Sequence, residues 1–268
     1  MQITYPETMD GIGYSEGGFS NHPADPGKAT MKGITQAVFD EYLAAEGLAP
    51  RSVRLITDAE VAAIYRTRYA NKIRYDDLPA GVDYSTMDAA VNSGVSRGAN
   101  WLQQALGVTS DGVVGKQTIE AAAKADAVTT IKRLCSKRTS FLHGLKTFAV
   151  FGKGWSSRVA RVEAASVSMA KRYGGATVTQ VAEFAQLESS SAKKSAKASS
   201  GAAGGTGVGS GTAATQLDWA HLTTFEIGLL AAGAIGIAVL VIFLIHRSRI
   251  QSSRAAAYAA VAAEGASA

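Results

Sequence analysis

Two carboxylates and a hydroxyl near the start of the chain have the residue types of a centre that cleaves glycosidic bonds. Eight residues lie between Glu16 and Asp25, and Thr30 follows five positions after Asp25. Such cleavage needs one carboxyl group that delivers a proton to the leaving oxygen and a second that activates water or stabilises positive charge. The spacing alone is unspecific, because Glu and Asp nine positions apart occur in any sequence. Asp25 also precedes a Pro, and an Asp in that place is more often an ordinary turn residue.

The elements around these residues are predicted by glycine and turn chemistry. Gly17 and Gly18 follow Glu16 and favour the end of a helix at that residue. Residues 19–35 are rich in Asn, Pro, Asp and Gly, which predicts a tight loop or short hairpin. The exposed carbonyls of a helix C-terminus disfavour an anion and so raise the pKa of a carboxyl group placed there. Glu16 therefore fits a general acid, and Asp25 fits its partner.

The rest of the first 173 residues has mainly helical periodicity. Thr35 is expected to cap a helix over 36–46, and Thr57 and Glu60 have the spacing of a capping box that opens the next one. Two short helices are expected on either side of Gly94, then one long or two consecutive helices over 117–145, and a last helix over 155–173. The predicted fold class is mostly α, with a small β-hairpin near the N-terminus.

The C-terminal third has a different composition. Residues 174–187 receive no assignment. Residues 188–216 are mostly Ser, Ala, Gly and Lys, which predicts a flexible linker. Residues 227–245 form a run of nineteen without charge, about 28 Å long as a helix, which predicts a single transmembrane helix in contact with a lipid bilayer. An Ala-rich tail over 247–268 follows.

Charges around the hydrophobic run predict an orientation. Arg247, Arg249 and Arg254 follow it, which favours a cytoplasmic tail and a periplasmic N-terminal domain at a bacterial inner membrane. The first twenty residues lack a secretion signal, which favours the opposite orientation. Gly228, Ala232 and Gly236 form a small-residue stripe, so self-association of this helix and simple Ala/Gly filler both stay open.

Composition excludes several other classes of function. The net charge is +5 with both signs interspersed, which is too mild to predict a nucleic-acid partner. Cys135 is the single cysteine and lies in a helical stretch, so it is interpreted as a small buried hydrophobe. The sequence predicts no metal site and no cofactor.

A family resemblance gives the carboxylates a specific meaning. The stretch "EGGFSNHPADPGKATMKGIT" closely resembles the start of the glycoside hydrolase family 108 muramidases, whose catalytic glutamate aligns with Glu16. The likeness continues through "YRTRYANKIRYDDLPAGVDYSTMDAAVNSG" and "SDGVVGKQTIEA", which resemble the second half of that family, a peptidoglycan-binding-type segment. It covers about residues 1–165.

The resemblance implies a lysozyme-like enzyme without a cofactor. It places Glu16 as the acid, and by a looser likeness to phage-type lysozymes it places Asp25 and Thr30 around the attacking water. The residues expected to contact peptidoglycan are Asn21, Lys32, Asn92 and Asp111, with Lys28 and Arg97 as further cationic candidates. Asp111 and Asn92 also have plain interpretations, as a turn residue and as part of a helix end.

The resemblance and the patterns together predict the following organisation: a lysozyme-like catalytic region (1–95), a helical peptidoglycan-binding-type region packed with it (96–173), an unassigned segment (174–187), a linker (188–216), a transmembrane helix (225–246) and a tail (247–268). The predicted function is a membrane-tethered muramidase that cleaves the bond between N-acetylmuramic acid and N-acetylglucosamine, in phage lysis or in cell-wall remodelling. A lytic transglycosylase that uses the same Glu16 and a non-catalytic wall-binding anchor remain as alternatives.

Overall fold

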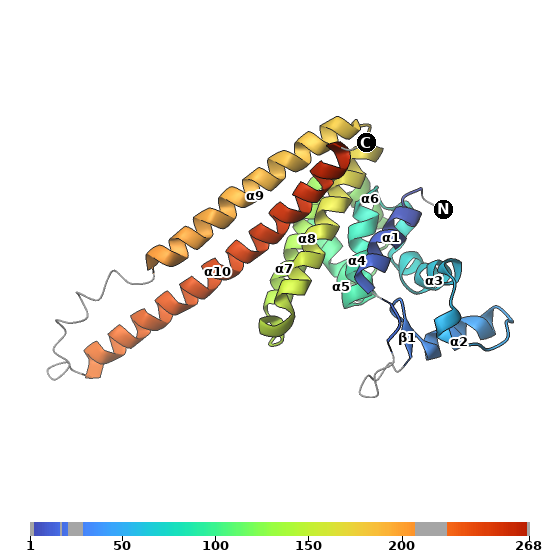
Figure 1. The fold of residues 1–268 in the computed structure, drawn as a ribbon, viewed down its shortest axis with the longest axis horizontal. Coiled ribbons are helices and arrows are strands. Elements are labelled where there is room, and N and C mark those ends of the chain that lie inside the picture. The colour runs from blue at the N-terminus through green and yellow to red at the C-terminus, as the bar shows by residue number, and fades with distance from the viewer. Residues whose placement is uncertain (1–2, 17, 21–28, 207–223, 267–268) are drawn as a thin grey trace. The chain divides into compact units, whose positions relative to one another are not determined.

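The computed structural model describes residues 3–16, 18–20, 29–206 and 224–266, and for 14–16, 204–206 and 224–235 it describes the backbone alone. It is mostly helical, with one two-stranded antiparallel sheet among the described residues (Figure 1). Two compact units are present, the first made of residues 1–145 and 165–175 and the second of 146–164 and 176–268.

The elements of the first unit follow the chain in this order: α1 (Tyr5–Glu16), β1 (Thr30–Met31), β2 (Ile34–Thr35), α2 (Gln36–Ala45), a 3₁₀ turn (Val53–Leu55), α3 (Asp58–Tyr65), a π-helical turn (Arg66–Ala70), two 3₁₀ turns (Asn71–Ile73 and Tyr75–Asp77), α4 (Val82–Ser93), α5 (Val95–Leu106), α6 (Lys116–Lys124) and α7 (Ala127–His143). The last residues of α8 (Phe148–Tyr173) also belong to this unit. The predicted hairpin and the mostly helical class are confirmed.

The local signals of the sequence correspond to observed helix ends. The Thr35 side chain accepts a hydrogen bond from the backbone amide of Val38, and Thr57 and Glu60 form a reciprocal capping box at the start of α3. Gly94, with φ of 94°, separates α4 from α5, and Gly107 ends α5 in the left-handed region. Residues 117–145 form two helices rather than one.

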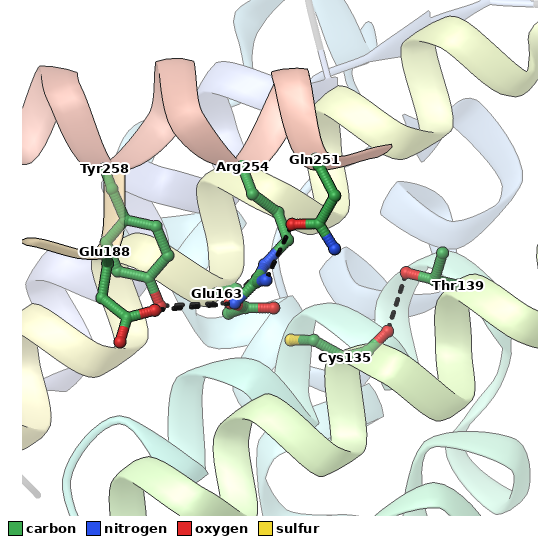
Figure 2. Close-up of polar contacts among 7 residues, drawn as sticks. All are labelled: Cys135, Thr139, Glu163, Glu188, Gln251, Arg254 and Tyr258. Carbon is green, nitrogen blue, oxygen red and sulfur yellow. Dashed lines mark hydrogen bonds and ion pairs between the residues drawn. The ribbon is translucent and has the colours of Figure 1, made fainter. Parts of the chain in front are cut away.

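The core of the first unit lies where α4, α5 and α7 pack together. Its fully buried side chains include Met87, Leu102, Ile131 and Leu134. Cys135 is buried and not in a disulfide, as the sequence predicts, and its backbone carbonyl accepts a hydrogen bond of 2.8 Å from the Thr139 hydroxyl (Figure 2). Helix α1 packs against this core through α4.

In the second unit, α9 (Val178–Thr206) and α10 (Thr224–Ala266) run antiparallel, side by side (Figure 1). The flexible linker predicted over 188–216 is wrong for residues 188–206, which lie in α9, while residues 207–216 lie outside the described residues. Ala is the best helix former, and Ala192 and Ala196 are buried in this unit. The Ser189 hydroxyl donates a hydrogen bond of 2.9 Å to the Ala255 carbonyl, so small side chains let the two helices approach closely.

The prediction of a transmembrane helix is wrong. The predicted bilayer contact, inner-membrane location and orientation depended on that helix, so they are wrong as well. Among the described residues, the structure contains no helix with the length and apolar character needed to cross a membrane. Residues 227–245 are part of α10, whose described side chains begin at 236. Helix α10 continues without a break through His246 and Arg247 to Ala266. Self-association through such a span loses its basis.

Candidate functional site

Glu16 is the last residue of α1, as the glycine pair after it predicts. Helix α1 is fixed at its start by a buried polar network that reaches α4. The Thr4 hydroxyl donates to Oδ2 of Asp83 at 2.7 Å, and the Thr8 hydroxyl lies 2.7 Å from the Tyr75 hydroxyl. These contacts give the helix that ends in Glu16 a defined position on the core.

The hairpin begins one short segment after Glu16. Thr30 pairs with Thr35 across the two strands, and its amide and carbonyl each form a 2.8 Å hydrogen bond with the backbone of Ser20. Thr30 is half-buried at the centre of this arrangement, with a neighbouring backbone on either side. Asn21, Asp25 and Lys28 lie outside the described residues, so their predicted roles stay predictions.

Lys32 forms the turn of the hairpin and connects it to α3. It has a φ of 50°, in the left-handed region that is uncommon for residues other than glycine. Its ammonium forms an ion pair with Asp58, and its carbonyl accepts a hydrogen bond of 3.0 Å from the Tyr65 hydroxyl. Two contacts therefore tie the hairpin turn to α3.

A pocket of about 450 Å³ lies between α1, the hairpin turn and α3. Its lining residues are Met9, Asp10, Ile12, Gly13, Lys32, Asp58, Val61 and Tyr65. Residues three or four apart lie on one face of a helix, so Gly13 and Ile12 share a face of α1 with the position of Glu16. The pocket thus opens along the face of α1 at whose end the predicted acid stands.

The structure gives Asn92 and Asp111 contacts within the first unit. The Asn92 side-chain oxygen accepts a hydrogen bond of 3.0 Å from Arg138, which also forms a buried ion pair with Asp88. An Oδ of Asp111 accepts hydrogen bonds from Gln103 and from the amide of Val113, and the Gln103 contact holds the pKa of Asp111 below its usual range. Both contacts favour the plain interpretations of these residues, and their part in substrate binding stays a prediction.

Arg97, the other cationic candidate, lies on the exposed surface of α5. Its guanidinium lies 4.5 Å from the centre of the Phe141 ring and donates to the Ser93 carbonyl at 3.1 Å. Its predicted contact with peptidoglycan is not tested by these packing interactions. Among the described residues, no group of three or more His, Cys, Asp or Glu side chains is arranged to hold a metal ion.

The sequence gives no role to Asp83, which the structure buries completely. Besides Thr4, it accepts hydrogen bonds from the amides of Gly81 and Tyr84 at 2.7 and 2.6 Å. Burial raises the pKa of Asp83 to about 6, although these hydrogen bonds act in the opposite direction. An Asp in the first turn of a helix is normally an exposed cap, so nothing in the local pattern distinguishes this one.

Comparison with known proteins identifies two consecutive family regions. Residues 9–94 match the family described as glycosyl hydrolase 108, and residues 97–160 match a predicted peptidoglycan domain. A solved structure, that of SagA from Brucella abortus, is 43% identical and superposes with a TM-score of 0.54. The match covers 63% of this chain and 96% of SagA. A search of the curated proteins found no match.

Glu16, Thr30, Lys32 and the pocket all lie within the residues that match the hydrolase family. Asp111 and Arg97 lie in the region that matches the peptidoglycan domain. The identity to SagA extends over nearly all of that protein. The chain therefore belongs to the glycosyl hydrolase 108 family and is a peptidoglycan hydrolase.

Proposed function

We propose that the protein is a muramidase that cleaves the glycosidic bond between N-acetylmuramic acid and N-acetylglucosamine, with Glu16 as its general acid. The observation that carries the proposal is the position of Glu16. It ends α1, the helix that precedes the hairpin in the chain, inside the residues that match a glycoside hydrolase family. A carboxyl group at a helix C-terminus is favoured in its protonated form, which is the form a general acid must have before the reaction.

In the proposed reaction, Glu16 gives its proton to the glycosidic oxygen as the bond from that oxygen to the anomeric carbon breaks. Asp25 and Thr30 position a water molecule, whose oxygen forms the new bond to the anomeric carbon and whose proton passes to a carboxylate. Each cut therefore consumes one water and releases one new reducing end. The backbone of the half-buried Thr30 is held between two neighbouring backbones, which supports a fixed position for this residue in the step.

Glu16→Gln in the full chain tests the proposal on purified peptidoglycan. Glutamine keeps the shape of the side chain but has no acidic proton, so the cleavage rate is expected to fall by about 10²- to 10⁴-fold. Glu46→Gln is the matched control, because Glu46 is an exposed glutamate at the C-terminal end of α2. It should leave the rate unchanged, and both variants should still sediment with peptidoglycan. Wild-type turnover by Glu16→Gln would remove Glu16 from the mechanism.

The masses of the products separate hydrolysis from the transglycosylase alternative. Hydrolysis adds one water to each cleaved strand, whereas transglycosylation by Glu16 alone would release an anhydro-sugar with no added water. We expect the hydrated products. Anhydro products that disappear in Glu16→Gln would replace the muramidase assignment while keeping Glu16 as the catalytic residue.

A further inference from the structure

A second pocket, of about 520 Å³, lies within the second unit, between the start of α8 and the middle of α10. Residues 148–156 of α8 provide one wall and residues 246–253 of α10 provide the other. The volume is within the range of small-molecule sites, roughly 300 to 1,000 Å³. The α10 wall lies outside both regions that match known families, so neither family accounts for this pocket.

Two aromatic rings connect the walls at one end of the pocket. The rings of Phe148 and His246 have their centres 5.4 Å apart, with an angle of 33° between their planes. Gly152, one turn after Phe148, is buried, and a Cβ at that position would lie 2.6 Å from the Phe148 ring. The absence of a side chain at Gly152 therefore lets the Phe148 ring lie against α8 and still reach α10.

The charged residues that line the pocket are all basic. Lys153 of α8 and Arg249 of α10 are both exposed side chains of the lining, which contains no Asp or Glu. Within the described part of the chain, neither of them forms an ion pair with a carboxylate. Arg254, further along α10, differs because it pairs with Glu163. Two cations from different helices therefore line one space that no described anion neutralises.

Hydroxyl groups add further hydrogen-bond donors to the lining. Four serines contribute to it, and two of them, Ser248 and Ser252, are four residues apart on one face of α10. A lysine has three N–H donors, an arginine has five, and each serine has one O–H. This is more than the two oxygens of a carboxylate can accept. Phosphate oxygens suit such a set, because arginine binds them in pairs and lysine neutralises their charge.

We propose that this cationic pocket binds a phosphate group, either free or as the ester of an organic molecule. Lys153 and Arg249 would neutralise its charge, and the serines would donate to its remaining oxygens. The organic group of an ester would pack on the apolar part of the α8 wall, where Val150 is 75% exposed. The pocket shares no residue with the region that matches the hydrolase family, so this proposal does not depend on the reaction at Glu16.

The test is calorimetry of the full chain at low ionic strength with inorganic phosphate, phenyl phosphate and malonate. Malonate is the control for charge, because its two negative charges are on separate carboxylates and neither group presents three oxygens. We expect the phosphate probes to bind about tenfold or more tightly than malonate. Tighter binding of phenyl phosphate than of inorganic phosphate would identify an ester as the ligand, and equal binding would identify free phosphate.

The double variant Lys153→Gln/Arg249→Gln should weaken phosphate binding by about tenfold or more, because it removes both cations of the lining. Lys146→Gln/Arg247→Gln is the matched control. It removes the same charge from exposed residues of the same unit that do not line the pocket. Thermal unfolding should be the same in both double variants, since all four side chains are exposed.

Equal losses of affinity in the two double variants would show general attraction to a basic surface and would overturn the pocket as the site. Malonate binding as tight as that of phosphate, or no binding of either phosphate probe, would overturn phosphate recognition. Glu16→Gln should bind phosphate with the affinity of the parent. Failure of the proposed cleavage reaction is therefore distinct from failure of this site.

Discussion

At the scale of single residues, the buried carboxyl group of Asp83 joins the start of α1 to α4 in the first unit. It has no exposed surface, and it accepts hydrogen bonds from Thr4 and from two backbone amides at the start of α4. Burial raises its pKa from 3.8 to about 6, so the folded protein keeps a proton that the unfolded chain releases near pH 4. The contact that anchors α1 therefore has its own pH dependence.

Because the folded pKa of Asp83 is above the unfolded value, its contribution to stability is complete below about pH 4 and is lost as pH rises to about 6. The two values predict a loss of about 3 kcal/mol in the free energy of unfolding across this window. Asp83→Asn should remove this decline, since asparagine does not titrate. Urea unfolding between pH 4 and 7 measures this decline in the free energy of unfolding. Asp77→Asn is the control, because the carboxylate of Asp77 is exposed. A decline in Asp83→Asn as steep as that in the parent would contradict the assignment.

At the scale of elements, the hairpin is held to α3 by few contacts. The sheet has two residues in each strand, which is far too little to be stable alone. The Tyr65 hydroxyl bonded to the Lys32 carbonyl, and the Lys32 ion pair with Asp58, connect its turn to a helix. Thr30 belongs to this hairpin, so its position depends on the contact with Tyr65, which is more than thirty residues away in sequence.

Tyr65→Phe removes the hydroxyl but keeps the ring that lines the pocket. Losing one hydrogen bond should lower the free energy of unfolding by about 1 kcal/mol. If the hairpin positions Thr30 for the proposed reaction, kcat on peptidoglycan should fall while KM changes little. Tyr69→Phe is the control, because the Tyr69 ring packs on Tyr65 with ring centres 5.4 Å apart. Equal kinetics in both variants would show that the Tyr65 contact does not position the hairpin.

At the scale of the whole molecule, the family regions and the compact units do not share boundaries. The peptidoglycan domain ends at residue 160, inside the part of α8 that belongs to the second unit. In that unit, Arg254 of α10 donates to Oε1 of Glu163 of α8 at 2.7 and 3.0 Å, and the Tyr258 hydroxyl donates to the same oxygen (Figure 2). Burial raises the pKa of Tyr258 above its usual range, and the negative charge of Glu163 raises it further. This cluster joins α10 to α8 at a residue just beyond the end of the family region.

Arg254→Met would leave Glu163, whose side chain is 7% exposed, without its cation. An unpaired buried charge costs about 3 to 5 kcal/mol, so amide hydrogen exchange should accelerate in α9 and in residues 248–266. Adding Glu163→Gln removes the buried charge and should restore part of the protection. Slow exchange in Arg254→Met, or no recovery in the double variant, would show that this pair does not hold the second unit together.

The sequence by itself determined the features that depend on neighbouring residues. The helix end at Glu16, the hairpin, the Thr35 cap, the Thr57 capping box and the break at Gly94 follow from local backbone chemistry. Its motifs also identified the family. The tertiary structure decided the burial of Asp83, the docking of Lys32 on Asp58 and the pocket beside Gly13, because each joins segments that are distant in sequence. It also placed residues 188–206 in a helix, since composition predicts flexibility only where small side chains find no partner surface to pack against.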